Sequence, residues 1–154
     1  MGRKGPFPTI GISKMSNKKQ NEETLTFTPR FDEYGLIPCI TTSAKTGKVL
    51  MMAWMNDEAI CKSIETGEAH YWSRSRQKLW HKGENSGNTQ KIIHMRTDCD
   101  QDCLWISVEM NPEASCHTGR KSCFYREINL QADPKLGQMK FIDANRLFDP
   151  KKVY

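Results

Sequence analysis

The sequence predicts a single α+β domain that is rich in antiparallel strands and has one main helix. Its length of 154 residues suits one domain with a hydrophobic core of its own. Short apolar segments recur along the chain, and turn-forming residues separate them by only a few positions, which favours antiparallel neighbours. One segment, residues 56–66, combines helical spacing with capping residues at both ends, and it predicts the helix.

The first two strands are predicted to form a hairpin. Residues 36–43, LIPCITTS, are rich in residues that favour strands, and a turn at 45–47 with the sequence KTG follows them. Residues 48–55, KVLMMAWM, are almost continuously apolar, so we expect them to form a buried second strand.

The helix is expected to begin after Asn56. The side chain of Asn56 can cap the first turn, and Asp57 and Glu58 carry negative charge next to the positive end of the helix dipole. Gly67 suits the left-handed residue that commonly ends a helix. The face expected to be buried consists of Ala59, Ile60, Ser63 and Ile64.

The rest of the domain is predicted to continue as short strands. Residues 69–83, AHYWSRSRQKLWHKG, suggest a strand, a basic turn and another short strand, and KIIHMRT at 91–97 suggests the next. Apolar and polar residues alternate in CLWISVEM at 103–110, as in a strand with one buried face. CFYREINL at 123–130 is expected to be a final core strand, and FIDANRLFD at 141–149 a short helix.

Three parts of the chain are expected. They are a flexible, lysine-rich N-terminal tail over 1–24, a folded domain over 25–130, and a C-terminal extension over 131–154 that packs on the domain. The tail has five Lys or Arg and two Glu, so it carries +3 of the net charge of +5. The remaining +2 is less positive charge than a DNA-binding domain usually concentrates, which argues against a nucleic-acid partner.

The chain has neither a signal peptide nor a membrane span by its sequence pattern. No apolar segment of signal-peptide type stands at the N-terminus, and the longest apolar run, at 49–55, is much shorter than a bilayer span. We therefore expect a cytoplasmic protein with no membrane partner, whose six cysteines are reduced thiols. A disulfide between Cys116 and Cys123 is the least favoured interpretation of the segment SCHTGRKSCF.

Three cysteines, Cys99, Cys116 and Cys123, form a candidate zinc site. Three thiolates with water as the fourth ligand would make an open catalytic site, whereas the addition of Cys103 would close it into a structural one. The spacing does not match common zinc ribbons, and it separates these alternatives only weakly. His117 favours the catalytic interpretation, because a histidine next to a ligand can act as general base. The other two cysteines are expected to be ordinary core thiols: Cys39 and Cys61.

Three aspartates, Asp98, Asp100 and Asp102, form a candidate site for a hard divalent cation. In an extended backbone alternate side chains share one face, so the carboxylates would lie together and Cys99 would lie opposite. Hard oxygen ligands suit Mg²⁺ or Ca²⁺. The EF-hand is excluded, because Cys103 stands where that loop needs glycine. An acidic, solvated turn is the alternative interpretation.

The segment between Ala69 and Gly83 is basic and aromatic, with no acidic residue. Such a composition suits phosphate pairing and base stacking, although an ordinary amphipathic hairpin has it as well. The loop that follows contains Gly83 and Gly87, whose backbone N–H groups could face a phosphate. The candidate substrate-binding residues are Arg74, Arg76, Trp80, Lys82 and Ser86.

Five segments in this order resemble the phosphoribosyl-AMP cyclohydrolase family: GLIPCI, VLMMAWMN, HYWSRSRQKLWHKGENSG, DCDQD and CHTGRKSCFY. The resemblance extends over residues 31–127, which is nearly all of the predicted domain. In that family the reaction is the hydrolytic opening of the adenine ring of 1-(5-phosphoribosyl)-AMP between N1 and C6, in histidine biosynthesis. The resemblance therefore implies an enzyme that acts on a small bis-phosphorylated nucleotide.

The resemblance also implies cofactors and an assembly. The family is an intertwined homodimer with active sites at the subunit interface, so a second chain would complete a metal site. Two residues depart from the family pattern: Asn88 stands where the family usually has histidine, and Cys103 replaces a small or polar residue. The implied metal ligands are Cys99, Cys116 and Cys123 for zinc, and Asp98, Asp100 and Asp102 for magnesium.

A second hypothesis comes from a different class. The chain could be a nucleic-acid-binding module with a structural zinc, in which residues 74–82 form the binding platform. That hypothesis predicts binding to single strands that weakens steeply with salt. It gives no role to His117.

Overall fold

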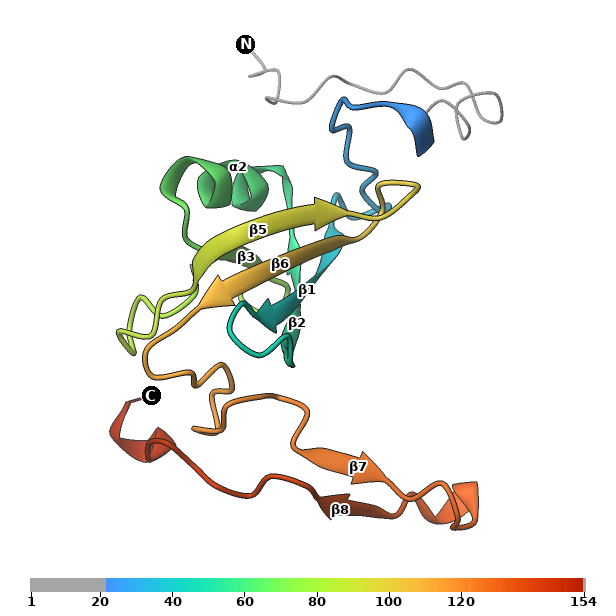
Figure 1. Cartoon of the computed structure of the whole chain (residues 1–154), viewed down its shortest axis with the longest axis vertical. Helices are drawn as coiled ribbons and strands as arrows, with labels where there is room; N and C mark the ends of the chain where they lie inside the picture. Colours follow the sequence, from blue (N-terminus) through green and yellow to red (C-terminus); the bar gives the residue numbers. More distant parts are fainter. Residues whose placement is uncertain (1–21, 154) are drawn as a thin grey trace.

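The computed structural model describes residues 22–153, so the predicted N-terminal tail lies outside the described residues except for its last three positions. A six-stranded sheet with one helix forms the main body, and a separate two-stranded sheet follows it (Figure 1). The strands of the main sheet have the order β4-β3-β2-β1-β6-β5. Their bounds are β1 Ile37–Ser43, β2 Val49–Met55, β3 His70–Ser73, β4 Lys78–His81, β5 Lys91–Thr97 and β6 Leu104–Glu109.

The prediction that the sheet is antiparallel throughout was wrong at one position. β1 and β6 pair in parallel, with Cys39 opposite Leu104 and Ser43 opposite Val108. The strands joined by a turn or short loop are antiparallel, as expected. β1 and β6 are not joined in this way, because β2, the helix and three further strands lie between them in sequence. Turn chemistry therefore does not dictate their relative direction.

The helix α2, Asp57–Thr66, forms where it was predicted. Asn56 Oδ1 accepts a hydrogen bond from the Ala59 backbone N–H at 2.8 Å, and Gly67 ends the helix in the left-handed conformation with φ 71°. The predicted buried face is one residue too wide, because Ile64 is 58% exposed. Within residues 22–153, no helix is long and apolar enough to cross a membrane.

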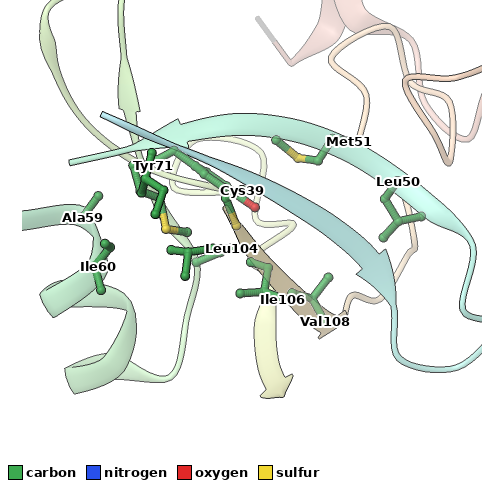
Figure 2. Close-up of a cluster of buried hydrophobic side chains, with 12 residues drawn as sticks. Cys39, Leu50, Met51, Ala59, Ile60, Tyr71, Leu104, Ile106 and Val108 are labelled. Carbon is green, nitrogen blue, oxygen red and sulfur yellow. The ribbon is translucent and has the colours of Figure 1, made fainter. Parts of the chain in front are cut away.

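The hydrophobic core lies between the sheet and α2 (Figure 2). The alternation predicted for β6 is confirmed, because Leu104, Ile106 and Val108 are all buried. Cys39 is a core thiol, as expected, but Cys61 is only half-buried on α2. The remaining core side chains come mainly from β1, β2, α2 and β3: Ile37, Leu50, Met51, Met55, Ala59, Ile60, Ala69 and Tyr71.

Two predictions for the C-terminal part were wrong. Residues 123–130 do not form a core strand: β7, Arg126–Ile128, is exposed and pairs with β8, Met139–Phe141, in a sheet of its own. Residues 141–149 form no helix, and only short 3₁₀ turns occur nearby, at Pro134–Leu136 and Pro150–Lys152. An apolar pattern can indicate a strand, but it does not specify which sheet the strand joins.

Candidate active site

A cavity of about 580 Å³ opens between the β3–β4 hairpin and the segment that follows β6. It brings together side chains that are far apart in sequence. β4 and the turn before it supply Arg76 and Trp80, and the loop after β4 supplies Lys82 and Ser86. The segment after β6 supplies further lining residues: Ser115, His117 and Cys123.

One loop, residues 115–123, carries two of the candidate zinc ligands and His117; we call it the thiol loop. Cys116 is buried, and its sulfur accepts a hydrogen bond from Thr118 Oγ1 at 3.0 Å. Cys123 is attached to β2, because its backbone N–H donates to the Leu50 carbonyl at 2.7 Å. Burial, together with the neighbouring Cys116 thiol, raises the pKa of Cys123 to about 12. The two sulfurs are thus neighbours whose negative charges would repel each other, a pairing that a bound cation would stabilise.

Lys82 lies beside these two thiols. Its ammonium is buried, donates to the Ser115 carbonyl at 2.7 Å, and lies 5.2 Å from the centre of the Trp80 ring. Burial lowers the pKa of Lys82, and the charges of Cys123 and Cys116 oppose this effect. The contact holds one end of the thiol loop against the end of β4.

The candidate substrate-binding residues do not all lie in one place. Arg76 lines the cavity, and its guanidinium carbon lies 6.0 Å from the centre of the Trp80 ring. Arg74 is absent from the cavity lining, and its guanidinium lies over the Trp54 ring at 5.0 Å. Ser86 lines the cavity and accepts a hydrogen bond from the Asn88 backbone N–H at 3.3 Å. The cavity wall therefore combines three cationic side chains, Arg76, Lys78 and Lys82, with an aromatic face and a polar loop.

His117 is exposed and lines the cavity, and an additional histidine, His81, lines it as well. His81 Nε2 lies 2.7 Å from Glu68 Oε2, and the imidazole stacks on His70 with ring centres 4.3 Å apart. No catalytic role was predicted for His81 from the sequence. His70 and His81 come together only through the register of β3 and β4, in which they are direct partners. The cross-strand position of two histidines in a predicted hairpin was the available signal.

The three candidate magnesium ligands, Asp98, Asp100 and Asp102, lie together, but not for the predicted reason. The segment is a turn between β5 and β6 rather than an extended strand, and Gln101 in it has φ 59°. Asp98 Oδ1 accepts hydrogen bonds from the backbone N–H groups of Asp102 and Cys103, both at 3.1 Å. The turn thereby brings one oxygen of each carboxylate within 4.8 Å of the others.

The aspartate turn is attached to the start of the domain through Gln101. The Gln101 side chain accepts a hydrogen bond from the Thr28 N–H at 2.8 Å and donates one to the Thr26 carbonyl at 3.3 Å. Its backbone carbonyl accepts from the Arg30 N–H at 2.8 Å. Partial burial and hydrogen bonds with the other two aspartates raise the pKa of Asp102 to about 6. Hydrogen bonds with Asp102 and Asp98 instead lower the pKa of Asp100, so Asp102 holds a proton more readily than Asp100 does.

The third candidate zinc ligand, Cys99, is not near the other two in one chain. It is exposed in the aspartate turn, before β6, whereas Cys116 and Cys123 follow β6. The six residues of β6 span roughly 17 Å, and the two segments leave opposite ends of that strand (Figure 1). Within residues 22–153, the aspartates are the one set of three or more such groups close enough to hold an ion.

The loop at one wall of the cavity depends on a glycine. Gly83 has φ 87°, and a Cβ at this position would lie 2.1 Å from the Asn88 carbonyl carbon. We expect Gly83→Ala to lower the free energy of unfolding by about 3 kcal/mol, because backbone strain and a clash with main chain add together. Gly87→Ala is the matched control: Gly87 has φ 77° but no atom within 4 Å of that Cβ position, so about 1 kcal/mol is expected. Denaturant unfolding measures both, and equal losses would contradict the close approach.

Comparisons with known proteins point to one family. A family model described as phosphoribosyl-AMP cyclohydrolase matches residues 51–125. A protein with that name from Bradyrhizobium diazoefficiens is 58% identical over 133 residues, which cover 86% of this chain and 93% of the relative. One from Nitrobacter hamburgensis is 53% identical over 139 residues, covering 90% of this chain and 93% of the relative. One from Rhodopseudomonas palustris strain BisB18 is 55% identical over 135 residues, covering 86% and 90%.

Proposed function

Because this chain belongs to the phosphoribosyl-AMP cyclohydrolase family, we propose that it opens the N1–C6 bond of 1-(5-phosphoribosyl)-AMP with the help of zinc. Membership of this family makes the chain a hydrolase of histidine biosynthesis that acts on a cyclic amidine. The observation that carries this proposal is the composition of one cavity. Cys123 and His117 lie on its wall together with Arg76 and Trp80. An imidazole and one thiol of the proposed zinc site thus share a cavity with side chains suited to a nucleotide.

Zinc fits the donor set that the chain provides. Cys116 and Cys123 are neighbouring thiols, and thiolates are preferred zinc ligands. With Cys99 as a third ligand, one coordination position would stay open. When bound there, zinc supplies the Lewis acidity that lowers the pKa of water at neutral pH. Lys82 offsets part of the negative charge of the thiolates, since its ammonium is buried beside them.

His117 is the proposed proton carrier. The reaction adds water to C6 and breaks the C6–N1 bond, and the water oxygen becomes the carboxamide C=O. Both water protons therefore leave the oxygen: one reaches N1, and the other is released to solvent when the substrate ring is cationic. Substitution at N1 makes the adenine ring cationic, which leaves C6 electrophilic before any attack. An imidazole can both accept and donate a proton, so the same side chain can accept the first proton and return it. Its exposed place in the cavity lining would allow it to meet the substrate directly.

The basic and aromatic wall is proposed to hold the substrate. Trp80 would stack on the base, while Arg76 and the loop at Ser86 would take a phosphate, with Lys82 at the inner end. Arg74 lies over Trp54 outside the cavity lining, so we propose it only as an outer contact for the second phosphate.

Two chains are proposed to share each zinc site, because Cys99 lies at the far end of β6 from the other thiols. An apolar row on the outer face of the sheet supports a homodimer. Met52, Ile40 and Trp105 are direct neighbours across β2, β1 and β6, and each is about 40% exposed. Burial of such a row against a second copy is favourable.

Magnesium is proposed to bind at the aspartate turn, where one oxygen of each of the three carboxylates lies within 4.8 Å of the others. Hard oxygen ligands suit this ion. In the shared assembly the turn would arrive beside the cavity together with Cys99. A divalent cation there would counter a substrate phosphate.

Turnover of phosphoribosyl-AMP with and without chelation tests the zinc dependence. We expect the purified protein to lose activity on treatment with a zinc chelator and to recover it when zinc, but not magnesium alone, is returned. Loss with recovery by zinc would support the proposal. Equal turnover rates before and after complete removal of zinc would reject it.

A further inference from the structure

We propose that the C-terminal segment, residues 126–153, is a clamp that positions the thiol loop, and that Phe141 acts through Arg120 as its main positioning residue. This proposal deepens the proposed function, and only its catalytic consequence rests on that function. The segment lies beyond the residues that match the family model. Its last part returns to the chain that follows β6 (Figure 1).

Arg120 is an unusual residue of the thiol loop. Its side chain is 7% exposed, and its Nε has no hydrogen-bond partner among residues 22–153. Its guanidinium carbon instead lies 4.1 Å from the centre of the Tyr125 ring and 5.6 Å from that of Phe141. The two rings are nearly parallel, at 9°, with centres 6.1 Å apart. A desolvated guanidinium against two aromatic faces has a favourable cation–π interaction, which is stronger than the same contact in water.

The backbone joins Arg120 directly to a proposed zinc ligand. The Cys116 N–H donates to the Arg120 carbonyl at 3.1 Å, and the Gly119 N–H donates to the Cys116 carbonyl at 2.9 Å. This turn sets where the Cys116 sulfur and the adjacent His117 point. β2 holds only the other end of the loop, through the bond from Cys123 N–H to the Leu50 carbonyl and the bond from Ser122 Oγ to the Val49 carbonyl. Restraint of Arg120 therefore restrains Cys116.

Other contacts of the C-terminal segment reach the same turn. The Leu147 N–H donates to the Gly119 carbonyl at 2.6 Å. Gly119 has φ 87°, and a Cβ there would lie 2.2 Å from the Phe148 carbonyl oxygen, so the two backbones approach as only glycine permits. Pro150 of the same segment lines the cavity, as do His117 and Cys123 of the thiol loop. The segment therefore contacts the loop on the side that β2 does not hold.

The test compares two variants of one residue in metal-free protein. Phe141→Leu keeps an apolar side chain but removes the aromatic face, whereas Phe141→Tyr keeps the face. Alkylation by iodoacetamide, followed by mass spectrometry at each cysteine, reports how often the thiol loop opens at the buried Cys116. We expect Phe141→Leu to increase the rate of Cys116 alkylation about tenfold, because the buried guanidinium of Arg120 loses a cation–π contact and the loop opens more often. With Phe141→Tyr the rate should stay near that of the wild type, because the aromatic face remains.

Two controls separate a local effect from general unfolding. Cys39 is fully buried in the core, so its alkylation should stay slow in every variant. Leu130→Ala changes an 88% exposed residue of the same segment and should leave Cys116 protected. The clamp is overturned if Phe141→Leu leaves Cys116 protected, if Phe141→Tyr has the same effect as Phe141→Leu, or if Cys39 becomes reactive along with Cys116. Because the readout needs neither zinc nor substrate, a failure of the proposed function would leave its result intact.

Discussion

Replacement of Cys116 with serine is expected to remove zinc from the protein and to abolish turnover. A hydroxyl does not replace a thiolate as a zinc ligand at neutral pH. Mutation of residues that merely support metal ligands already costs 10–100-fold, so we expect the loss of a ligand to cost more than about 100-fold in activity. The measurements are zinc content after dialysis and the rate of phosphoribosyl-AMP hydrolysis.

The fold should survive this substitution. Cys116 is buried, but serine is slightly smaller, and the backbone bonds of the turn to Arg120 and Gly119 do not use the side chain. Circular dichroism and the unfolding midpoint check this point. Retention of zinc and turnover by a folded Cys116→Ser protein would remove Cys116 from the site.

Cys103→Ser is the matched control. Cys103 is half-buried, and its sulfur lies near the Leu104 carbonyl at 3.7 Å, at the start of β6. In an open site of three thiolates this sulfur is not a ligand, so we expect zinc content and turnover close to wild type. Loss of zinc from Cys103→Ser would instead indicate a closed site with four sulfurs, which is structural.

His117→Ala is expected to lower kcat by about 10²–10⁴-fold while zinc content and stability stay unchanged. The side chain is exposed, so its removal costs little packing. The readouts are kcat, KM and bound zinc at several pH values.

This substitution also separates the two classes of function considered for the chain. A structural zinc in a nucleic-acid-binding module has no need of His117, so that hypothesis predicts no functional change. If turnover by His117→Ala equals that of wild type across the pH range, another group carries the proton. His81, held by Glu68 on the cavity wall, would then be the residue to change next.

The parts of the fold that follow local rules were predictable from the sequence. Asn56 and Gly67 mark the ends of α2 because capping and left-handed backbone depend on neighbouring residues only. The parallel pairing of β1 with β6 joins segments that no turn connects, so no local pattern encodes it. The same reason explains the error at β7: its apolar residues indicate a strand, but they pair with β8 rather than with the main sheet.

In the candidate site too, residue types could be predicted from the sequence, whereas contacts between distant segments could not. The motifs indicated which residue types could bind metal, but the alternation argument for the aspartates was wrong, since the left-handed backbone at Gln101 makes the segment a turn. The separation of Cys99 from Cys116 depends on which end of β6 each one leaves. The contact of Phe141 with Arg120 joins residues from different segments, and no sequence pattern marks it.

Mixed dimers test the central claim most directly. Cys99→Ser and Cys116→Ser should each be inactive alone, because each damages every site in a dimer of identical chains. If the two variants are unfolded and refolded together, half of the dimers are mixed and each mixed dimer has one intact site, so about a quarter of wild-type turnover should return. Recovery to that level would show that Cys99 from one chain works with Cys116 and Cys123 from another. A mixture of fully exchanged dimers that stays inactive would contradict the shared zinc site.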